Sequence, residues 1–245
     1  MNFAIIAAGE GSRLAAEGIR EPKPLVSVAG ERLIDRLIRV FADNGANKIA
    51  VICNDHTTLV SSHLQHLQQH GLGDGRQVPL QYTVRSTPSS MHSFYELRHM
   101  LGDQPFVLTT VDTIFREDDF AHYIDAFRRT LSDGGDALMG VTDYIDDEKP
   151  LYVGTDEQMR VTGFYDSNPA DQPCRYISGG IYGLTPRALV TLEHCMERGE
   201  SRMRNFQRAL VADGLQVSAH PFSKVLDIDH ASDIQKAEAF LAGNK

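Results

Sequence analysis

Three short segments of the chain are apolar at consecutive positions rather than at alternating ones. They cover residues 3–8, 48–53 and 105–111. A strand with one face in water alternates apolar and polar residues, whereas a strand buried on both faces is apolar throughout. The pattern therefore predicts three strands of a parallel sheet that is covered on both sides.

Segments with helical periodicity lie between these strands. Apolar residues recur three and four positions apart in 33–41 and in 60–67, and a glycine that can end a helix follows each segment, at Gly45 and Gly71. Residues 90–101 have a similar pattern. Strands that alternate with helices predict an α/β fold, here a Rossmann-like three-layer α/β/α sandwich with a mixed, mainly parallel sheet.

The second half of the chain has a different pattern, with few helices between its first strands. We expect strands at 136–144, 151–155, 160–165 and 176–184, followed by helices at 186–198, 203–213 and 232–242. The chain has no linker, low-complexity tract or internal repeat. One compact domain over residues 1–245 is therefore the simplest organisation.

Composition and charge narrow the classes of protein to consider. The 245 residues carry a formal net charge of −9, which argues against a general nucleic-acid-binding protein, since such proteins usually have a basic face. No apolar run approaches the length of a membrane span, and the three cysteines form no CxxC pair. We expect a cytoplasmic protein that binds neither nucleic acid nor membrane, and association into a homo-oligomer stays open.

A glycine-rich loop directly follows the first predicted strand and reads Ala7-Ala8-Gly9-Glu10-Gly11-Ser12-Arg13-Leu14. Glycines let backbone amides approach phosphate oxygens, and the guanidinium of arginine suits a phosphate group. Ten residues on, Lys23 stands between two prolines that stiffen its backbone. A tight turn is the ordinary alternative for the glycine pair alone. Position 14 lacks the third glycine of a dinucleotide-binding loop, and the Gly-Lys-Ser/Thr of a Walker A loop is missing.

This combination resembles the opening motif of the sugar-phosphate nucleotidyltransferases and their cytidylyltransferase relatives. Their motif reads Ala-Ala-Gly-x-Gly-Ser/Thr-Arg-Leu and then Pro-Lys-Pro-Leu, with the spacing found here. The resemblance implies a nucleotide-binding half over residues 1–115 and an acceptor-binding half over 116–245. It assigns the nucleoside triphosphate to Ala8, Gly9, Gly11 and Ser12, and the catalytic contacts with its phosphates to Arg13 and Lys23.

Acidic residues end the third apolar run and precede the last predicted helix. Asp112 stands at the carboxyl end of a strand, where open α/β sheets bind ligands, and Asp227 and Asp229 share a face if they lie in a strand. The resemblance implies that Asp112 and one of the other two, with Asp229 favoured, bind Mg²⁺ as a cofactor. Capping of the last helix by Asp229 or Ser232 is the alternative. The family commonly has Gly-Asp at the first position, where this chain has Val111.

Ser89 and Ser90 begin the helix predicted at 90–101. Serines in this place contact an anion or a base, or they simply cap the helix. The segment Ser-Ser-Met-His-Ser-Phe-Tyr resembles the choline-phosphate cytidylyltransferase branch, so we assign both serines to the nucleotide.

Gly179, Gly180 and Tyr182 resemble the acceptor-side strand of the family. Two glycines in a strand also indicate a close approach to the backbone. Sugar nucleotidyltransferases often carry Glu-Lys-Pro before this strand, with the lysine on the sugar phosphate. Residues 164–169 contain no lysine, which leaves the identity of the acceptor open.

His63, His66 and His70 fall on one side of a predicted helix. A metal site is conceivable there, but no fourth ligand follows at a telling spacing. The apolar residues of the same helix form a separate buried stripe, so we expect the histidines to face solvent.

Together the motifs predict a Mg²⁺-dependent transfer of a nucleoside monophosphate from a nucleoside triphosphate to a sugar 1-phosphate, with release of pyrophosphate. A CTP:phosphocholine-type cytidylyltransferase is the first alternative. A glycosyltransferase of similar fold or a non-catalytic nucleotide-binding regulator is the second. The glycosyltransferase should show Asp-x-Asp where this chain reads Thr110-Val111-Asp112.

Overall fold

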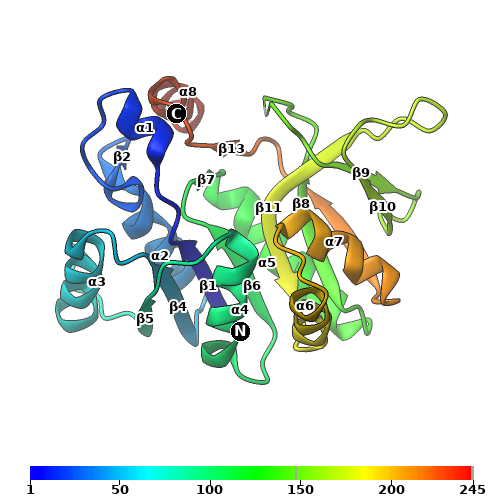
Figure 1. Ribbon diagram of the computed structural model, residues 1–245, viewed down its shortest axis with the longest axis horizontal. Helices are drawn as coiled ribbons and strands as arrows, with labels where there is room; N and C mark the ends of the chain where they lie inside the picture. Colours follow the sequence, from blue (N-terminus) through cyan, green and yellow to red (C-terminus); the bar gives the residue numbers. More distant parts are fainter. Residues whose placement is uncertain (147, 244–245) are drawn as a thin grey trace. The chain divides into compact units, whose positions relative to one another are not determined.

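The computed structural model describes residues 1–146 and 148–243 (Figure 1). It contains two compact units. The first is made of Met1–Gly102, Thr109–Ile114 and the chain from Leu226 onward, and the second of Asp103–Leu108 and Phe115–Val225. The first unit is therefore assembled from three stretches that are far apart in the sequence.

The first unit is built on parallel strands that are buried on both faces. β1 (Asn2–Ala7) is buried at every position and pairs in parallel with β4 (Lys48–Cys53), which pairs in parallel with β5 (Leu80–Val84). β6 (Phe106–Thr110) begins in the second unit and ends in the first. The apolar runs of the sequence form β1, β4 and β6, as predicted.

The predicted helices of the first unit are present. They are α2 (Leu33–Asp43), α3 (Thr58–His70) and α4 (Ser90–Leu101). The apolar stripe of α2 is buried, and Phe41 stacks on Phe3 of β1 with ring centroids 4.6 Å apart. Shorter elements that the sequence did not predict lie before α2: α1 (Ser12–Ala16), the 3₁₀-helix η1 (Lys23–Leu25), β2 (Ser27–Val28) and β3 (Glu31–Arg32).

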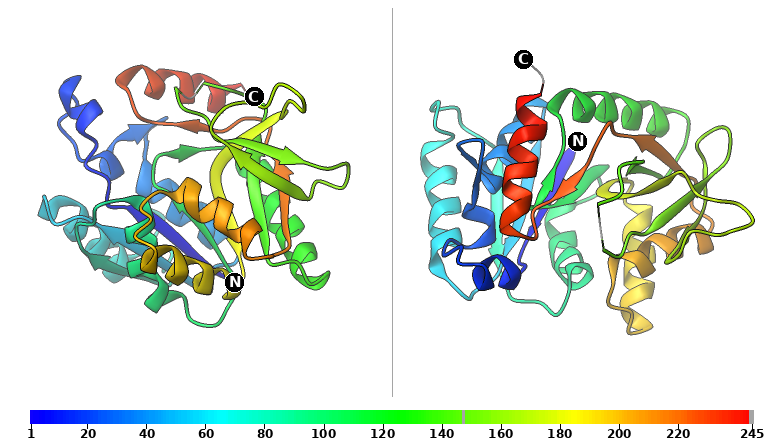
Figure 2. Two further views of the ribbon diagram at one scale, coloured as in Figure 1. Left: turned by 45° about the vertical axis from the view of Figure 1, so that its right-hand side comes forward. Right: turned by 90° about the horizontal axis from the view of Figure 1, so that it is seen from above.

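The C-terminal stretch completes the first unit. β13 (Leu226–Asp227) pairs antiparallel with β7 (Thr113–Ile114), and α8 (Ala231–Ala242) follows. Figure 2 shows α8, in red, beside the blue N-terminal segment. Two hydrogen bonds join them: the Glu17 carboxylate accepts from the backbone of Ala231 at 2.6 Å, and Glu238 accepts from that of Ala29 at 3.1 Å.

The second unit has a mixed set of strands. β8 (Ala137–Thr142) pairs antiparallel with β11 (Tyr176–Leu184) and in parallel with β12 (Val217–Pro221). β9 (Tyr152–Thr155) pairs antiparallel with both β10 (Val161–Tyr165) and β11. The helices are α5 (Glu117–Ser132), α6 (Arg187–Glu197) and α7 (Met203–Ala212). The predicted mixed, mainly parallel α/β architecture is confirmed.

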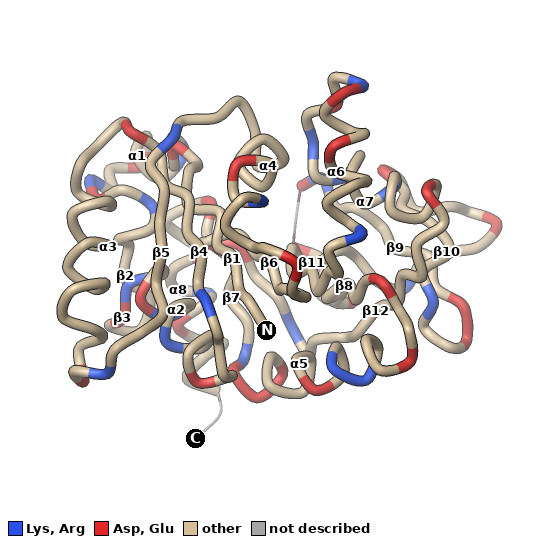
Figure 3. The backbone as a smooth tube through the Cα atoms, turned by 90° about the horizontal axis from the view of Figure 1, so that it is seen from below, with Lys and Arg blue, Asp and Glu red and all other residues tan. Residues whose placement is uncertain are grey.

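The elements α5 and β12 were not predicted from the sequence. The buried residues of α5 are Phe120, Tyr123, Ile124 and Phe127, which have helical spacing, so its signal was present in the sequence. Figure 3 shows residues of both charges along α5. Among the described residues, no helix combines the length and the apolar character that a membrane crossing needs.

Gly11 has a backbone conformation that other residues rarely adopt, and it has little space around it. Its φ is +64°, and a Cβ built there would lie 3.0 Å from Cβ of Lys23. Gly75 has a similar φ of +79°, but a Cβ there would meet nothing within 4 Å. Gly11 therefore allows the loop after β1 to pack directly against the chain at Lys23.

We predict that Gly75→Ala loses about 1–2 kcal/mol of unfolding free energy, the cost of a left-handed conformation with a Cβ. Gly11→Ala should lose about 1–3 kcal/mol more, because its methyl group also forces Lys23 to move. Calorimetric unfolding of both variants tests this. Equal losses would show that the contact with Lys23 carries no cost.

The three cysteines differ in accessibility. Cys53 and Cys195 are 0% exposed, and burial raises the pKa of each thiol to about 11. Cys174 is partly exposed, and burial raises its pKa less. Because thiolate is the reactive form, buried thiols with a high pKa react slowly near neutral pH.

We predict that a disulfide reagent such as Ellman's modifies one thiol, Cys174, in the native protein and three after denaturation. Replacement of Cys174 by Ser should remove the fast native phase. Three thiols that react at one rate in the native protein would contradict the burial of β4 and α6.

Candidate active site

A cavity of about 390 Å³ lies in the first unit, at the carboxyl ends of β1 and β6. Its volume is within the range of small-molecule sites. Of the residues that the sequence predicted for the site, it brings together the glycine loop, the two predicted catalytic cations, one of the two serines at the start of α4 and two of the three aspartates. Its lining is Ile6, Gly9, Gly11, Ser12, Arg13, Lys23, Ser90, Thr110, Val111, Asp112 and Asp229.

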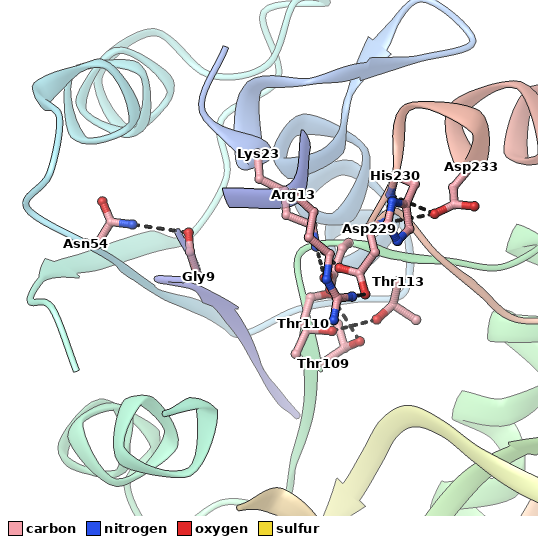
Figure 4. Close-up of polar contacts among 11 residues, drawn as sticks. Gly9, Arg13, Lys23, Asn54, Thr109, Thr110, Thr113, Asp229, His230 and Asp233 are labelled. Carbon is pink, nitrogen blue, oxygen red and sulfur yellow. Dashed lines mark hydrogen bonds and ion pairs between the residues drawn. The ribbon is translucent and has the colours of Figure 1, made fainter. Parts of the chain in front are cut away.

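The glycine loop is held in place by a residue that the sequence analysis did not select. The side-chain amide of Asn54, which follows β4, donates to the backbone carbonyls of Ala8 and Gly9, each at 3.2 Å. Figure 4 shows the bond to Gly9. Since both acceptors are carbonyl oxygens, these bonds leave the amides of the loop available. Ala8 itself does not line the cavity, whereas Gly9 and Gly11 do.

Lys23 lies at the centre of the site and is 8% exposed. Its ammonium Nζ is 2.5 Å from Oδ2 of Asp112 and 2.8 Å from Oδ1 of Asp229. Burial by itself would lower the pKa of Lys23, but the two carboxylates outweigh burial, so the pKa is raised and the side chain stays charged. Pro22 and Pro24 fix the backbone on either side, so the ammonium points from a stiff segment.

Arg13 contacts the same group of charges through Asp229. Its Nη1 is 3.0 Å from Oδ2 of Asp229, and its side chain is 57% exposed (Figure 4). Burial would raise the pKa of Asp229, but the hydrogen bond and charge of Lys23, together with Arg13, lower it. Two cations and two carboxylates therefore form one network in which both aspartates contact Lys23.

Asp112 owes its position to the end of β6. The amide of Val111 donates to the carbonyl of Ile6 at 3.0 Å, and the carbonyl of Asp112 accepts from the amide of Ile228 at 3.1 Å. The hydroxyls of Thr110 and Thr113 share a hydrogen bond of 2.8 Å. Oδ1 of Asp112 is buried and has no hydrogen-bond partner among the described residues. A buried carboxylate oxygen without a partner is costly unless a ligand satisfies it.

Asp229 is positioned by the start of α8. The amides of Asp229 and His230 both donate to the carboxylate of Asp233, at 3.2 and 2.8 Å. Glu17 contacts the His230 ring at 2.6 Å through Oε1, and its other oxygen binds the amide of Ala231. The N-cap residue of α8 is His230, so the alternative in which Asp229 or Ser232 caps this helix is wrong.

Asp227 differs from Asp229 in its surroundings. Asp227 is the last residue of β13 and is exposed, and it does not line the cavity. Asp229 lies beyond the strand, half-buried, with Lys23 and Arg13. Of the two acids before α8, Asp229 is the one with a place at the cavity.

Ser89 and Ser90 have different roles. Ser89 caps α4: its hydroxyl accepts from the amide of His92 at 3.4 Å and lies 2.9 Å from Nδ1 of the same histidine. Ser90 is exposed and lines the cavity. The next serine, Ser93, pairs with the hydroxyl of Thr87 at 2.6 Å.

The acceptor-side candidates lie in the second unit, on β11. Gly180 has a φ of +70° at a bulge in the pairing of β11 with β8, and a Cβ on Gly179 would lie 3.2 Å from the carbonyl of Gly140. Tyr182 is 6% exposed. The two glycines therefore allow the β-bulge in β11 to form. Bulges of this kind are common beside functional sites. Asp166, in the segment without a lysine, pairs with Arg204 at 2.5 Å and Arg208 at 2.7 Å.

Two of the three histidines of α3 are exposed, and the third contacts residues that lie earlier in the chain. His66 and His70 are exposed, as expected, and their rings stack with centroids 4.5 Å apart. His63 is half-buried and contacts Asp35 at 2.5 Å and Arg32 at 3.2 Å. Within residues 1–146 and 148–243, no group of three or more His, Cys, Asp or Glu side chains is arranged to hold a metal ion.

Comparison with known proteins gives one family. The chain is 25% identical over 245 residues to the UTP–glucose-1-phosphate uridylyltransferase AglF of Haloferax volcanii, covering 97% of this chain and 95% of that protein. A solved Bacillus anthracis structure, assigned as a glucose-1-phosphate thymidylyltransferase, has a TM-score of 0.82 at 19% identity and covers 100% of this chain and 96% of its own. The inositol-1-phosphate CTP transferase of T. maritima has a TM-score of 0.75 at 16% identity, covering 99% and 96%.

The two solved structures show the shared fold, and the match of the family model extends along the chain. The model described as nucleotidyl transferase matches residues 4–244, from β1 through α8. That range includes the glycine loop, Lys23 and both aspartates of the cavity. The chain belongs to the nucleotidyl transferase family.

Proposed function

We propose that this nucleotidyltransferase moves a nucleoside monophosphate from a nucleoside triphosphate to a sugar 1-phosphate and releases pyrophosphate. The observation that carries the proposal is the contact of Lys23 with Asp112 and Asp229 in a cavity lined by the glycine loop. The whole-length similarity to a uridylyltransferase that uses glucose 1-phosphate supports the choice of acceptor class.

The residues of the chain act mainly by placing phosphates and balancing their charge. Gly9 and Gly11 let backbone amides approach the triphosphate, with Ser12 as a further donor. Lys23 and Arg13 bring two positive charges to a ligand that carries several negative ones. Because Lys23 is buried, its charge acts in a region of low dielectric constant, where it is worth more than in water.

The chemical step is an in-line displacement. A phosphate oxygen of the acceptor attacks the α-phosphorus and forms the new P–O bond. The bond from the α-phosphorus to the bridging oxygen breaks, and pyrophosphate leaves with the electron pair. No side chain has to form a covalent intermediate, so positioning and electrostatic stabilisation suffice.

We propose Mg²⁺ as the cofactor, held by Asp112 and Asp229, with Asp227 as the weaker candidate. Oδ1 of Asp112 has no hydrogen-bond partner among the described residues, so it is free to coordinate a metal ion. Mg²⁺ in phosphate-transfer sites typically binds one or two carboxylates together with phosphates and water. When bound, the ion neutralises charge on the attacking and leaving oxygens. The two aspartates face the same cavity as the loop that would hold the triphosphate.

For the remaining contacts we propose that Ser89 and Ser90 lie near the nucleotide, and that Gly179, Gly180 and Tyr182 lie near the acceptor. Ser90 at the cavity supports the first assignment. The bulge at Gly180 supports the second, because it bends the strand locally. We further propose that the protein acts in the cytoplasm, which fits its three free thiols.

A second candidate is a CTP:phosphocholine-type cytidylyltransferase. The serine-rich segment at the start of α4 favours it, and an inositol-1-phosphate CTP transferase shares the fold. Both candidates predict release of pyrophosphate, so they differ only in base and acceptor. The glycosyltransferase alternative predicts none.

The direct test is pyrophosphate release with Mg²⁺, crossing CTP, UTP, GTP, ATP and dTTP with sugar 1-phosphates and phosphocholine. We expect release with one base and one sugar 1-phosphate, and loss of release on chelation of the metal. Release only with CTP and phosphocholine would favour the second candidate. If no combination releases pyrophosphate although the protein still binds nucleotide, the proposal is contradicted.

We predict that Asp112→Asn and Lys23→Ala each abolish turnover while the protein stays folded. Asp112→Asn removes a charge from the centre of the network, and Lys23→Ala removes the ammonium. Asp133→Asn, at the exposed end of α5, is the matched control and should keep full activity. Circular dichroism checks the fold. Normal turnover in either cavity variant would overturn the site assignment.

A further inference from the structure

We propose that Lys23 occupies the place of the divalent cation in the free protein, so that metal binds together with the nucleoside triphosphate rather than before it. This inference rests on the metal role proposed for Asp112 and Asp229. It concerns the order of binding, which the similarity to other nucleotidyltransferases does not address.

Nζ of Lys23 lies 2.5 Å from one carboxylate and 2.8 Å from the other, so it bridges both oxygens as a bound cation would. The remaining oxygen of Asp112, Oδ1, has no partner among the described residues. Lys23 therefore contacts one oxygen of each aspartate. Oδ1 of Asp112 is the unsatisfied oxygen that a metal ion could bind.

Lys23 and Arg13 already balance the charges of Asp112 and Asp229. A divalent cation added to this neutral group would meet the ammonium at short range, and like charges repel strongly where the side chains are buried. The side chain of Lys23 is 9% exposed, so it cannot easily turn out into water.

A bound triphosphate changes this balance of charge. Its phosphates bring several negative charges into the cavity beside Lys23 and Arg13, and both cations can then bind phosphate oxygens instead of the aspartates. The carboxylates lose their partners at the moment when phosphate oxygens become available as further ligands. Nucleotide and metal therefore strengthen each other's binding, and the coupling is reciprocal.

The test is equilibrium binding of Mn²⁺, followed by electron paramagnetic resonance in the absence of nucleotide. We expect Lys23→Gln to bind Mn²⁺ at least about tenfold more tightly than the wild type, since a tenfold change corresponds to a small part of the repulsion between nearby charges. Adding the triphosphate should tighten Mn²⁺ binding to the wild type. The same addition should tighten Mn²⁺ binding to Lys23→Gln much less.

Two controls make the result specific. Lys48→Gln removes the same charge at the start of β4, where Lys48 binds the carbonyl of Met100, and should match the wild type. Asp112→Asn added to Lys23→Gln should abolish the gain. If Lys23→Gln folds poorly, Lys23→Met replaces it, and the rise in its melting temperature with Mn²⁺ gives the same reading.

Equal or weaker Mn²⁺ binding by the folded Lys23 variants would overturn the inference, because Lys23 would then not compete with the metal. This outcome is distinct from failure of the proposed function. Tighter Mn²⁺ binding in a protein that transfers no nucleotide would leave the competition in place and reject the reaction. Turnover in the wild type without any gain in the variants would do the reverse.

Discussion

One buried ammonium group determines the organisation of the site. Lys23 is 8% exposed, and a charge in that position is stable only with partners close by. Asp112 and Asp229 supply them, and they come from the end of β6 and the start of α8, far apart in the sequence. Three distant segments must therefore meet at one point, and the glycine loop packs against the same lysine through Gly11.

The C-terminal stretch, from Leu226 onward, also holds residues of the cavity in place. β13 pairs with β7 directly after Asp112, and the capping interactions of α8 hold Asp229. Glu17 joins the end of α1 to the start of α8 through two bonds of 2.6 Å. The end of α1, which follows the glycine loop, is thus joined through one carboxylate to the two residues that follow Asp229.

The sequence predicted what depends on local pattern. The buried strands, the stripe of α2, the glycine loop, Lys23 and Asp112 could all be read from neighbouring residues. The supporting residues Asn54, Glu17 and Asp233 could not, because each acts through a partner that only the fold brings near, such as Glu17 with His230 across 213 positions. Which of Asp227 and Asp229 lines the cavity depends on where β13 ends, and the ends of elements are poorly specified by local sequence.

Lys23, Asp112 and Asp229 would together form a metal site that depends on bound nucleotide. A crystal structure with Mn²⁺ and a non-hydrolysable triphosphate, recorded with anomalous scattering from the metal, tests it most directly. We expect a manganese peak bonded to Asp112 and Asp229, with the ammonium of Lys23 on a phosphate oxygen and Gly9 and Gly11 beside the triphosphate. A lysine still bridging both aspartates, with metal and nucleotide bound elsewhere, would contradict the account.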